Sequence, residues 1–277
     1  MSPLVTTDWL AEHLRAPDLR IVDASWYLPD AKRDPRAEYL NSHIPGAVFF
    51  DIDAIADKSS PYPHMLAPPE QFASRMKKLG LGNGHRIIVY DGAGLFSAAR
   101  VWWTFRAMGH EEVFVLDGGF PKWVAEKRPV EDYQPVHSER HFTPRPNHLL
   151  MRDASQMVNN IASKREQVAD ARSPARFNAT DPETRPGVRG GHIPGAKNLH
   201  YSKLINADGT LRAPEALADL FRTAGIDVAK PIAASCGSGV TASIILLALK
   251  TMGAPDGALY DGSWVEWGSR HDLPLET

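Results

Sequence analysis

The motif His43-Ile44-Pro45-Gly46-Ala47 recurs in the second half of the chain as His192-Ile193-Pro194-Gly195-Ala196. Other landmarks repeat in the same order and at a similar spacing. Ile21-Val22-Asp23-Ala24 matches Val168-Ala169-Asp170-Ala171, Pro69 to Gly80 matches Pro214 to Gly225, and Asp117-Gly118-Gly119 matches Asp261-Gly262-Ser263. Self-similarity of this kind indicates that the chain is a duplication of one structural unit.

The 277 residues are enough for two domains of about 140 residues each. A polar, proline-bearing stretch between the halves, QPVHSERHFTPRPN at 134–147, has neither a helical nor a strand period. We therefore predict a first domain over 1–135, a linker over 136–150 and a second domain over 151–277.

Within each half, short apolar runs bounded by Gly and Pro alternate with helical patterns. The runs 86–90, 113–116 and 231–235 are typical of buried parallel strands, and Gly80, Gly109, Gly225 and Gly253 follow helical patterns as stop signals. This alternation predicts an α/β fold, with a mainly parallel sheet flanked by helices in each domain. Ligands bind such sheets at the carboxyl edge of the strands.

Composition excludes several kinds of function. The net charge is −2, with 31 basic and 33 acidic side chains. The chain therefore lacks the surplus of basic residues that is typical of nucleic-acid-binding proteins. The longest strongly apolar stretch, 244–249, is far short of a bilayer span, and the amino terminus lacks an apolar signal region, so we expect a cytoplasmic protein without a membrane segment. Because Cys236 is the only cysteine, no internal disulfide or Cys-rich metal site can form.

Cys236 lies in the segment Ala234-Ser235-Cys236-Gly237-Ser238-Gly239-Val240-Thr241-Ala242, between a predicted strand and a helix predicted over 241–252. Gly237 and Gly239 allow successive N–H groups to converge, and the helix adds its positive N-terminal dipole. Both effects favour a thiolate, which is the reactive form of cysteine. A buried, inert cysteine is the alternative.

These motifs, together with Leu259-Tyr260-Asp261-Gly262-Ser263-Trp264-Val265-Glu266-Trp267, make the chain similar to tandem rhodanese-like sulfurtransferases of the mercaptopyruvate kind. The resemblance covers nearly the whole chain. It implies two rhodanese-like domains, of which only the second is catalytic, with Cys236 as the nucleophile that becomes a persulfide. Asp91 occupies the corresponding place in the first half, so that half has no nucleophile there.

The loop composition bears on the sulfur donor. Cysteine phosphatases of this fold need an arginine six residues after the cysteine, and this chain has Ala242. Thiosulfate-specific relatives resemble Cys-Arg-Lys-Gly-Val-Thr, whereas this chain has the uncharged Gly237 and Ser238 beside the nucleophile. A dianionic donor would therefore meet an unfavourable field, which favours a monocarboxylate such as 3-mercaptopyruvate.

The resemblance also assigns the remaining site residues. It implies that Arg176 and Arg185 bind the carboxylate and keto oxygen of the donor, a task that suits the planar guanidinium. It implies a proton relay of Ser238, His64 and Asp53, which is physically reasonable because an imidazole oriented by a carboxylate can move the proton that pyruvate must gain. Asp53 and His64 as a helix cap and a loop pair are the alternative. The loop residues Gly237, Gly239, Val240 and Thr241 are expected to line the donor site.

Other polar residues are expected to have structural roles. His43 and His192 are duplicated in a half without a nucleophile, so we expect them to hydrogen-bond a turn, and we expect Arg172 and Arg189 to be solvated surface charges. His137 and His141 lie in the predicted linker without supporting ligands, so no metal or cofactor is predicted. Five tryptophans are expected to pack in cores or between domains, namely Trp102, Trp103, Trp123, Trp264 and Trp267.

The sequence thus predicts an enzyme that takes sulfur from 3-mercaptopyruvate, releases pyruvate and passes the sulfur to cyanide, a small thiol or a thioredoxin-like protein. Two alternatives remain open: a thiosulfate:cyanide sulfurtransferase, and a non-catalytic interaction module built from two rhodanese-like domains.

Overall fold

The computed structural model describes residues 2–277, which divide into two compact units. The first unit contains the residues up to Lys58, Leu66–Asn147 and Asn206–Leu211. The second contains Ser59–Met65, His148–Ile205 and Arg212–Thr277. Each unit has its own sheet and its own hydrophobic core.

The first unit contains a five-stranded sheet in which all neighbouring strands are parallel, in the order β1-β5-β4-β2-β3. Its strands are β1 (Leu4–Val5), β2 (Leu19–Asp23), β3 (Ala47–Phe49), β4 (Arg86–Tyr90) and β5 (Val113–Leu116). Its helices are α1 (Thr7–His13), α2 (Pro35–Asn41), α3 (Ile52–Ile55), α4 (Pro69–Lys78), α5 (Ala98–Ala107) and α6 (Gly119–Ala125).

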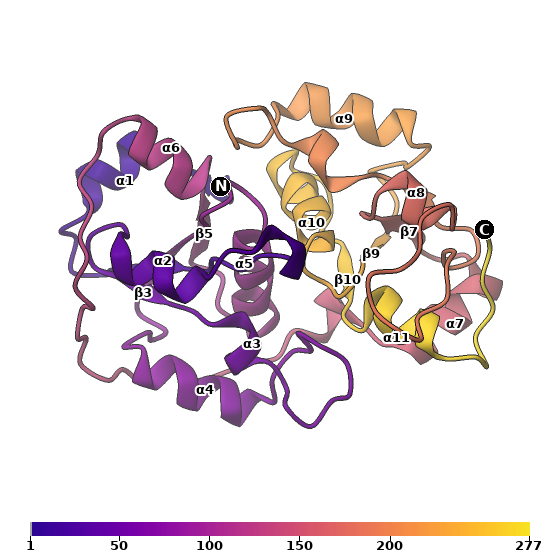
Figure 1. Ribbon diagram of the computed structural model, residues 1–277, viewed down its shortest axis with the longest axis horizontal. Coiled ribbons are helices and arrows are strands. Elements are labelled where there is room, and N and C mark those ends of the chain that lie inside the picture. The colour runs from indigo at the N-terminus through magenta and orange to yellow at the C-terminus, as the bar shows by residue number, and fades with distance from the viewer. Residues whose placement is uncertain (1) are drawn as a thin grey trace. The chain divides into compact units, whose positions relative to one another are not determined.

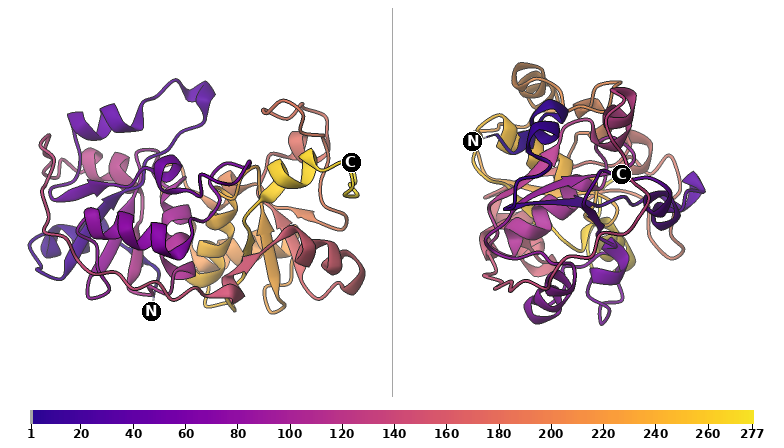
Figure 2. Two further views of the ribbon diagram at one scale, coloured as in Figure 1. Left: turned by 90° about the horizontal axis from the view of Figure 1, so that it is seen from below. Right: turned by 90° about the vertical axis from the view of Figure 1, so that its left-hand side faces the viewer.

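The second unit repeats this topology, with the strand order β6-β10-β9-β7-β8 and parallel pairing throughout. Its strands are β6 (Met151–Arg152), β7 (Gln167–Asp170), β8 (Lys197–Asn198), β9 (Ile232–Ser235) and β10 (Ala258–Tyr260). Its helices are α7 (Ala154–Ser163), α8 (Pro174–Phe177), α9 (Pro214–Thr223), α10 (Ala242–Thr251) and α11 (Ser263–Ser269). Helices flank the strands of each sheet (Figure 1), and Figure 2 shows them from two further directions.

The repeated strand order confirms the α/β fold and the internal duplication. Equivalent residues also take equivalent positions, since Asp23 ends β2 opposite Tyr90 of β4 and Asp170 ends β7 opposite Ser235 of β9. The sheets are wholly parallel, which requires both faces to be covered and explains why the central strands are continuous apolar runs.

Helix ends follow the signals predicted from glycine. Gly80, Gly109, Gly225 and Gly253 directly follow the C-cap residues of α4, α5, α9 and α10, and each has a positive φ between 70° and 81°. A left-handed residue at this position closes the last helical turn, and glycine adopts it without a steric penalty. These four turns direct the chain back toward the next strand.

The helix that follows the cysteine loop is buried on nearly all sides. Residues 242–249 of α10 are all buried, and the helix lies against β9 and β10 (Figure 1). It begins one residue later than expected, because Thr241 is its N-cap residue. Across residues 2–277, no helix combines the length and the apolar character needed to cross a membrane.

The five tryptophans expected in cores are buried, each with an exposed fraction of at most 1%. Within the predicted linker, 136–150, residues 136–147 form neither helix nor strand, whereas His148–Leu150 form a short 3-10 helix that belongs to the second unit. Residues 136–147 are nevertheless anchored on the first unit, because Phe142 is 3% exposed and its ring meets Phe72 edge-on at 5.3 Å.

Candidate active site

Cys236 immediately follows β9, the middle strand of the second sheet, and lies at the carboxyl edge. All four residues of β9 are buried, and Cys236 itself is 2% exposed. Because the strand is fixed on both sides by β10 and β7, the first residue of the loop is held in place by the sheet. This is the edge where parallel sheets bind ligands.

Hydrogen bonds fix the loop that carries Cys236. The Ser263 hydroxyl accepts the Cys236 N–H at 3.2 Å, and two N–H groups of α11 donate to the carbonyls of Cys236 and Gly237 at 2.9 and 2.8 Å. Gly239, with φ of +80°, turns the chain so that its N–H points at Cys236 Sγ, 3.1 Å away. This hydrogen bond fixes the direction of the Sγ atom relative to the loop.

Three further N–H groups of the loop are available. Those of Val240, Thr241 and Ala242 donate to no other group within the described residues. The first N–H groups of a helix have no intrahelical acceptor, and they carry the positive end of the helix dipole. The loop therefore offers a set of donors at the start of α10 that suits an anion.

The first unit shows what this set of donors can hold. Asp91 follows β4, in the place of Cys236, and it is fully buried. Its Oδ2 accepts N–H groups from Phe96, Ser97 and Ala98 at 2.7, 2.9 and 2.8 Å, and its Oδ1 accepts the Ala93 N–H at 2.9 Å.

Ala98 and Ala242 both open the helix after the loop, so the three donors to Asp91 Oδ2 correspond to the three available donors of the second unit. We call each set of three N–H donors an anion cradle: 96–98 in the first unit and 240–242 in the second. In the first unit, the Asp91 carboxylate fills the cradle. In the other copy a thiol stands at its base.

Ser238 and His64, which the sequence placed in a relay, are brought together within the second unit. Ser238 Oγ and His64 Nδ1 are 2.9 Å apart, and both residues are buried. His64 has a φ of 63°, a backbone conformation that costs about 1 kcal/mol or more for a residue with a side chain. Asp53 belongs to the first unit, where its Oδ2 accepts a hydrogen bond from the Trp26 indole at 3.0 Å. The relay through Asp53 stays a prediction.

Arg176, on the short helix α8, lies against the loop. A Cβ atom added at Gly237 would be 3.3 Å from Arg176 Nη2 and 3.9 Å from Nη1. Arg176 forms an ion pair with Glu183, while its buried Nε has no acceptor among the described residues. An unsatisfied buried donor costs about 1–3 kcal/mol, which an anionic ligand would remove. The guanidinium is thus placed to meet an anion at the loop.

The expectation that Arg172 is a solvated surface charge is wrong. Its side chain is 1% exposed and pairs with Asp170 and Glu183 at 2.7 and 2.8 Å. It also donates to the Gly191 carbonyl at 2.8 Å and stacks on the Trp264 ring, 4.3 Å from its centroid. Arg172 is a buried structural ion whose two carboxylate partners satisfy its charge.

Arg189 is also not a free surface charge, because its guanidinium donates to the backbone carbonyls of Trp267, Gly268, Arg270 and Leu273. The first three of these carbonyls lie in α11 or directly after it. A cation at a helix C-terminus satisfies carbonyls that the helix leaves open. Arg185, by contrast, is exposed, and within residues 2–277 its side chain has no ion-pair or hydrogen-bond partner. Binding of the donor by Arg185 stays a prediction.

The two repeated histidines have the structural role expected for them. His192 Nδ1 is 2.9 Å from the Phe177 carbonyl at the end of α8, and the two rings stack at 3.7 Å. His43 Nδ1 is 2.6 Å from the Tyr39 carbonyl in the first unit. His192 therefore fixes the helix that carries Arg176, one residue before Phe177.

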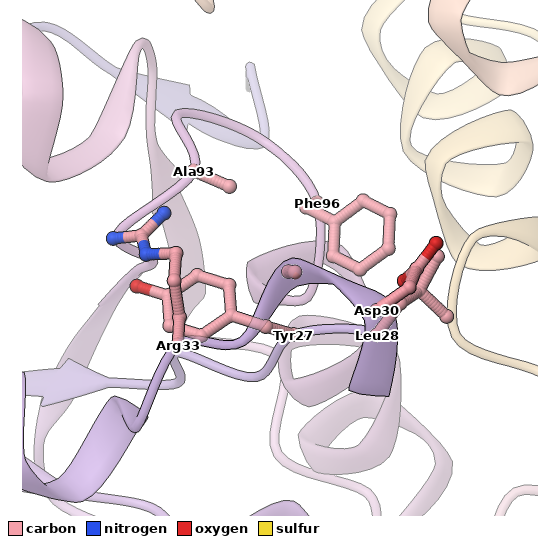
Figure 3. Close-up of a pocket in the computed structure, with 7 residues that line it drawn as sticks. Tyr27, Leu28, Asp30, Arg33, Ala93 and Phe96 are labelled. Atoms are coloured by element: carbon pink, nitrogen blue, oxygen red, sulfur yellow. The ribbon is translucent and has the colours of Figure 1, made fainter.

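The corresponding edge of the first unit contains a pocket of about 320 Å³ (Figure 3). It is lined by Tyr27, Leu28, Asp30, Ala31, Arg33, Ala93 and Phe96. The Arg33 guanidinium stacks over the Tyr27 ring at 3.8 Å, as Figure 3 shows, and it is paired with Glu38 at 2.6 Å. This cation is already neutralised, and the nearby cradle is filled by Asp91.

Comparison with known proteins gives a consistent result. The model of the rhodanese-like domain matches residues 6–126 and 153–270. The chain is 45% identical to the 3-mercaptopyruvate sulfurtransferase of Escherichia coli (98% of this chain, 97% of that protein) and 43% identical to the thiosulfate sulfurtransferase of Bos taurus (99% and 94%). A crystal structure of SseA from Escherichia coli, a 3-mercaptopyruvate sulfotransferase, superposes with a TM-score of 0.88 at 42% identity, covering 95% of this chain and 99% of that one.

Proposed function

The chain belongs to the rhodanese-like domain family, and on that basis we propose that it is a sulfurtransferase that takes sulfur from 3-mercaptopyruvate onto Cys236. The observation that carries this function is the anion cradle. Asp91 fills it in the first unit, whereas in the second unit its donors are available above a thiol. A persulfide on Cys236 would place its terminal sulfur anion where the carboxylate oxygen of Asp91 lies in the other copy.

The reaction proceeds in two covalent steps. The Cys236 thiolate attacks the sulfur of mercaptopyruvate, the carbon–sulfur bond breaks, and its electron pair leaves with pyruvate as the enolate. The enolate takes up a proton, and the Ser238 hydroxyl, 2.9 Å from His64 Nδ1, is the relay that we assign to this step. In the second step an acceptor thiolate or cyanide attacks the outer sulfur, and Cys236 leaves as thiolate. Alternate release of two products gives ping-pong kinetics.

Overall identity does not select the donor, because 45% to a mercaptopyruvate enzyme and 43% to a thiosulfate enzyme are nearly equal. The loop supports mercaptopyruvate. Gly237 and Ser238 place no cation beside the sulfur. The Arg176 guanidinium lies against Gly237, where it suits a carboxylate remote from the reacting atom.

Intact mass spectrometry tests the nucleophile. Mercaptopyruvate is expected to add one sulfur to the wild-type protein and none to Cys236→Ser, which should also lose turnover. An adduct on the serine variant would contradict the assignment, because the chain has no other thiol.

Side-by-side kinetics with the two donors tests the substrate. We expect a higher kcat/KM for mercaptopyruvate than for thiosulfate. The opposite order, with the Cys236 adduct intact, would leave a thiosulfate sulfurtransferase.

A further inference from the structure

Glu183 is a buried carboxylate in an otherwise exposed segment. Of residues 178–187, it alone is not exposed, and its side chain is 4% exposed. Its Oε1 accepts Arg172 Nη1 at 2.8 Å, and its Oε2 accepts Arg176 Nη2. Burying a carboxylate costs free energy unless the carboxylate is paired with a cation. The side chain of Glu183 points inward, away from its exposed neighbours, and its two arginine partners offset that cost.

One of the two partners cannot move. Arg172 is held by Asp170, by the Gly191 carbonyl and by the face of Trp264, so that its side chain is 1% exposed. Glu183 is therefore fixed by Arg172, and its second oxygen is presented in a defined direction. The ion pairs run in the order Asp170, Arg172, Glu183, Arg176, from the end of β7 to the cysteine loop.

The other partner, Arg176, has fewer contacts that hold its side chain in one position. Arg176 is on a helix of four residues, and its side chain is 23% exposed. A long side chain loses rotamer freedom when it is held in one position, and an arginine without a partner would spread over several rotamers. Glu183 accepts a hydrogen bond from Arg176 Nη2 and none from Nη1 or Nε. The guanidinium of Arg176 also lies against Gly237.

We propose that Glu183 is a positioning residue, which holds the Arg176 guanidinium against the Cys236 loop and so determines binding of the anionic end of the donor. The inference builds on the proposed function for the identity of that donor. Within residues 2–277, the hydrogen bonds of the Glu183 carboxylate go to Arg172 and Arg176 and not to the loop. Glu183 acts through Arg176, with Arg172 as the fixed support.

A simple electrostatic role for Glu183 predicts the opposite result, which makes the proposal testable. If Glu183 only lowers the local positive charge, its removal must make the loop more attractive to anions. If it positions Arg176, its removal releases the cation and makes the loop less attractive. Alkylation of Cys236 by iodoacetate, an anion, and by the neutral iodoacetamide reports this difference without any sulfur donor.

The decisive quantity is the ratio of the two alkylation rate constants in Glu183→Gln, which keeps the volume of the side chain. We expect the iodoacetate:iodoacetamide ratio to fall roughly threefold or more below that of wild type, toward the value of Arg176→Ala, as expected for a unit charge moved by a few ångströms. A ratio that rises, or stays unchanged, overturns the proposal. Thermal unfolding shows whether the variant is folded, and Glu183→Asp provides a milder variant if it is not.

A double-mutant cycle tests whether Glu183 acts through Arg176. In the Arg176→Ala background, Glu183→Gln is expected to leave the ratio unchanged, because the positioned group is gone. An equal fall in both backgrounds would mean that Glu183 affects the loop by another route, which overturns the proposal. Asp181→Asn is the matched control, since it removes an exposed carboxylate from the same segment and is expected to leave the ratio at the wild-type value.

Kinetics connects the positioning role to the donor. Glu183→Gln is expected to raise KM for mercaptopyruvate about tenfold, as for loss of a charged hydrogen bond, with a smaller change in kcat. If the protein does not use mercaptopyruvate, this assay fails while the alkylation ratio still falls. The failure of the proposed function and the failure of the positioning role are thus separate outcomes.

Discussion

Asp23 ends β2 of the first unit as a buried acid, and replacing it with asparagine is expected to stabilise that unit at neutral pH. The residue is 4% exposed, and its carboxyl group accepts the Ser25 N–H at 2.8 Å. Burial raises the pKa of Asp23 to about 6, and the nearby Asp91 adds to the shift. Asparagine keeps an oxygen for the Ser25 N–H but carries no charge.

The magnitude follows from the shift. The ordinary pKa is 3.8, so the increase is about two units, and each unit corresponds to about 1.4 kcal/mol. Ionised Asp23 therefore lowers the free energy of unfolding by up to roughly 3 kcal/mol, relative to an acid with an unshifted pKa.

The sign of the pH dependence is fixed by the direction of the shift. Because the folded pKa is raised, the folded protein binds the Asp23 proton more tightly than the unfolded chain does. The stability contributed by this proton is fully present below about pH 4 and is lost as the pH rises through about 6. The advantage of Asp23→Asn should grow over the same range, from about 1 kcal/mol at pH 4.5 to about 3 kcal/mol at pH 7.5.

Urea unfolding at pH 4.5, 6 and 7.5 measures the advantage, and pulsed hydrogen exchange of peptides from β2 and β4 reports the first unit separately. The duplication supplies a matched control. Asp170 ends β7 at the equivalent position but pairs with the buried Arg172, so Asp170→Asn should destabilise the second unit by about 3–5 kcal/mol. The reasoning would be refuted if Asp23→Asn were less stable than wild type at pH 7.5. It would also be refuted if the difference in unfolding free energy between variant and wild type were the same at all three pH values.

Three further changes test the loops. Asp91→Asn should destabilise the first unit by about 2–4 kcal/mol in urea, because an amide cannot accept all four N–H groups and leaves at least one buried donor unsatisfied; an unchanged midpoint would exclude a carboxylate-filled cradle. Gly237→Ala should raise KM for mercaptopyruvate severalfold by displacing Arg176, whose Nη2 is 3.3 Å from the added carbon, while leaving the alkylation rate of Cys236 by iodoacetamide nearly constant. Ser238→Ala should lower kcat for mercaptopyruvate by about 100-fold without creating a preference for thiosulfate; full turnover would remove Ser238 from the proton path.

The duplication, the α/β fold and the cysteine loop could be predicted because each depends on local sequence signals. The repeated motifs predict the same topology for both halves, and glycines mark the ends of the helices. A lone cysteine in a glycine-rich loop between a strand and a helix indicates where the site lies. Gly237 also has no positive φ, so a side chain there meets Arg176 and not a strained backbone.

The ion-pair network was beyond prediction for a physical reason. Arg172 and Glu183 lie in polar segments that read as solvated surface, and only the folded structure shows that Asp170 and Trp264 surround Arg172. The duplication contained one usable signal, since Asp170 has a basic neighbour two residues later where Asp23 has Ser25. The proposed role of Arg185 rests on resemblance alone, and its exposed side chain has no contact in the described residues that would test that role.

The difference between Asp91 and Cys236 has a thermodynamic consequence for the second unit. The anion of the first cradle is the Asp91 carboxylate, which is always present, whereas the second cradle would gain its anion only when sulfur is loaded onto Cys236. The sulfur stays bonded to Cys236 when the chain unfolds, but its hydrogen bonds with the loop N–H groups exist only in the folded state, so loading would stabilise the fold. Linkage makes the effect reciprocal: the more the loaded loop stabilises the fold, the more the fold resists reductive removal of the sulfur. The same N–H groups would thus set both the rigidity of the second unit and the reduction potential of its persulfide.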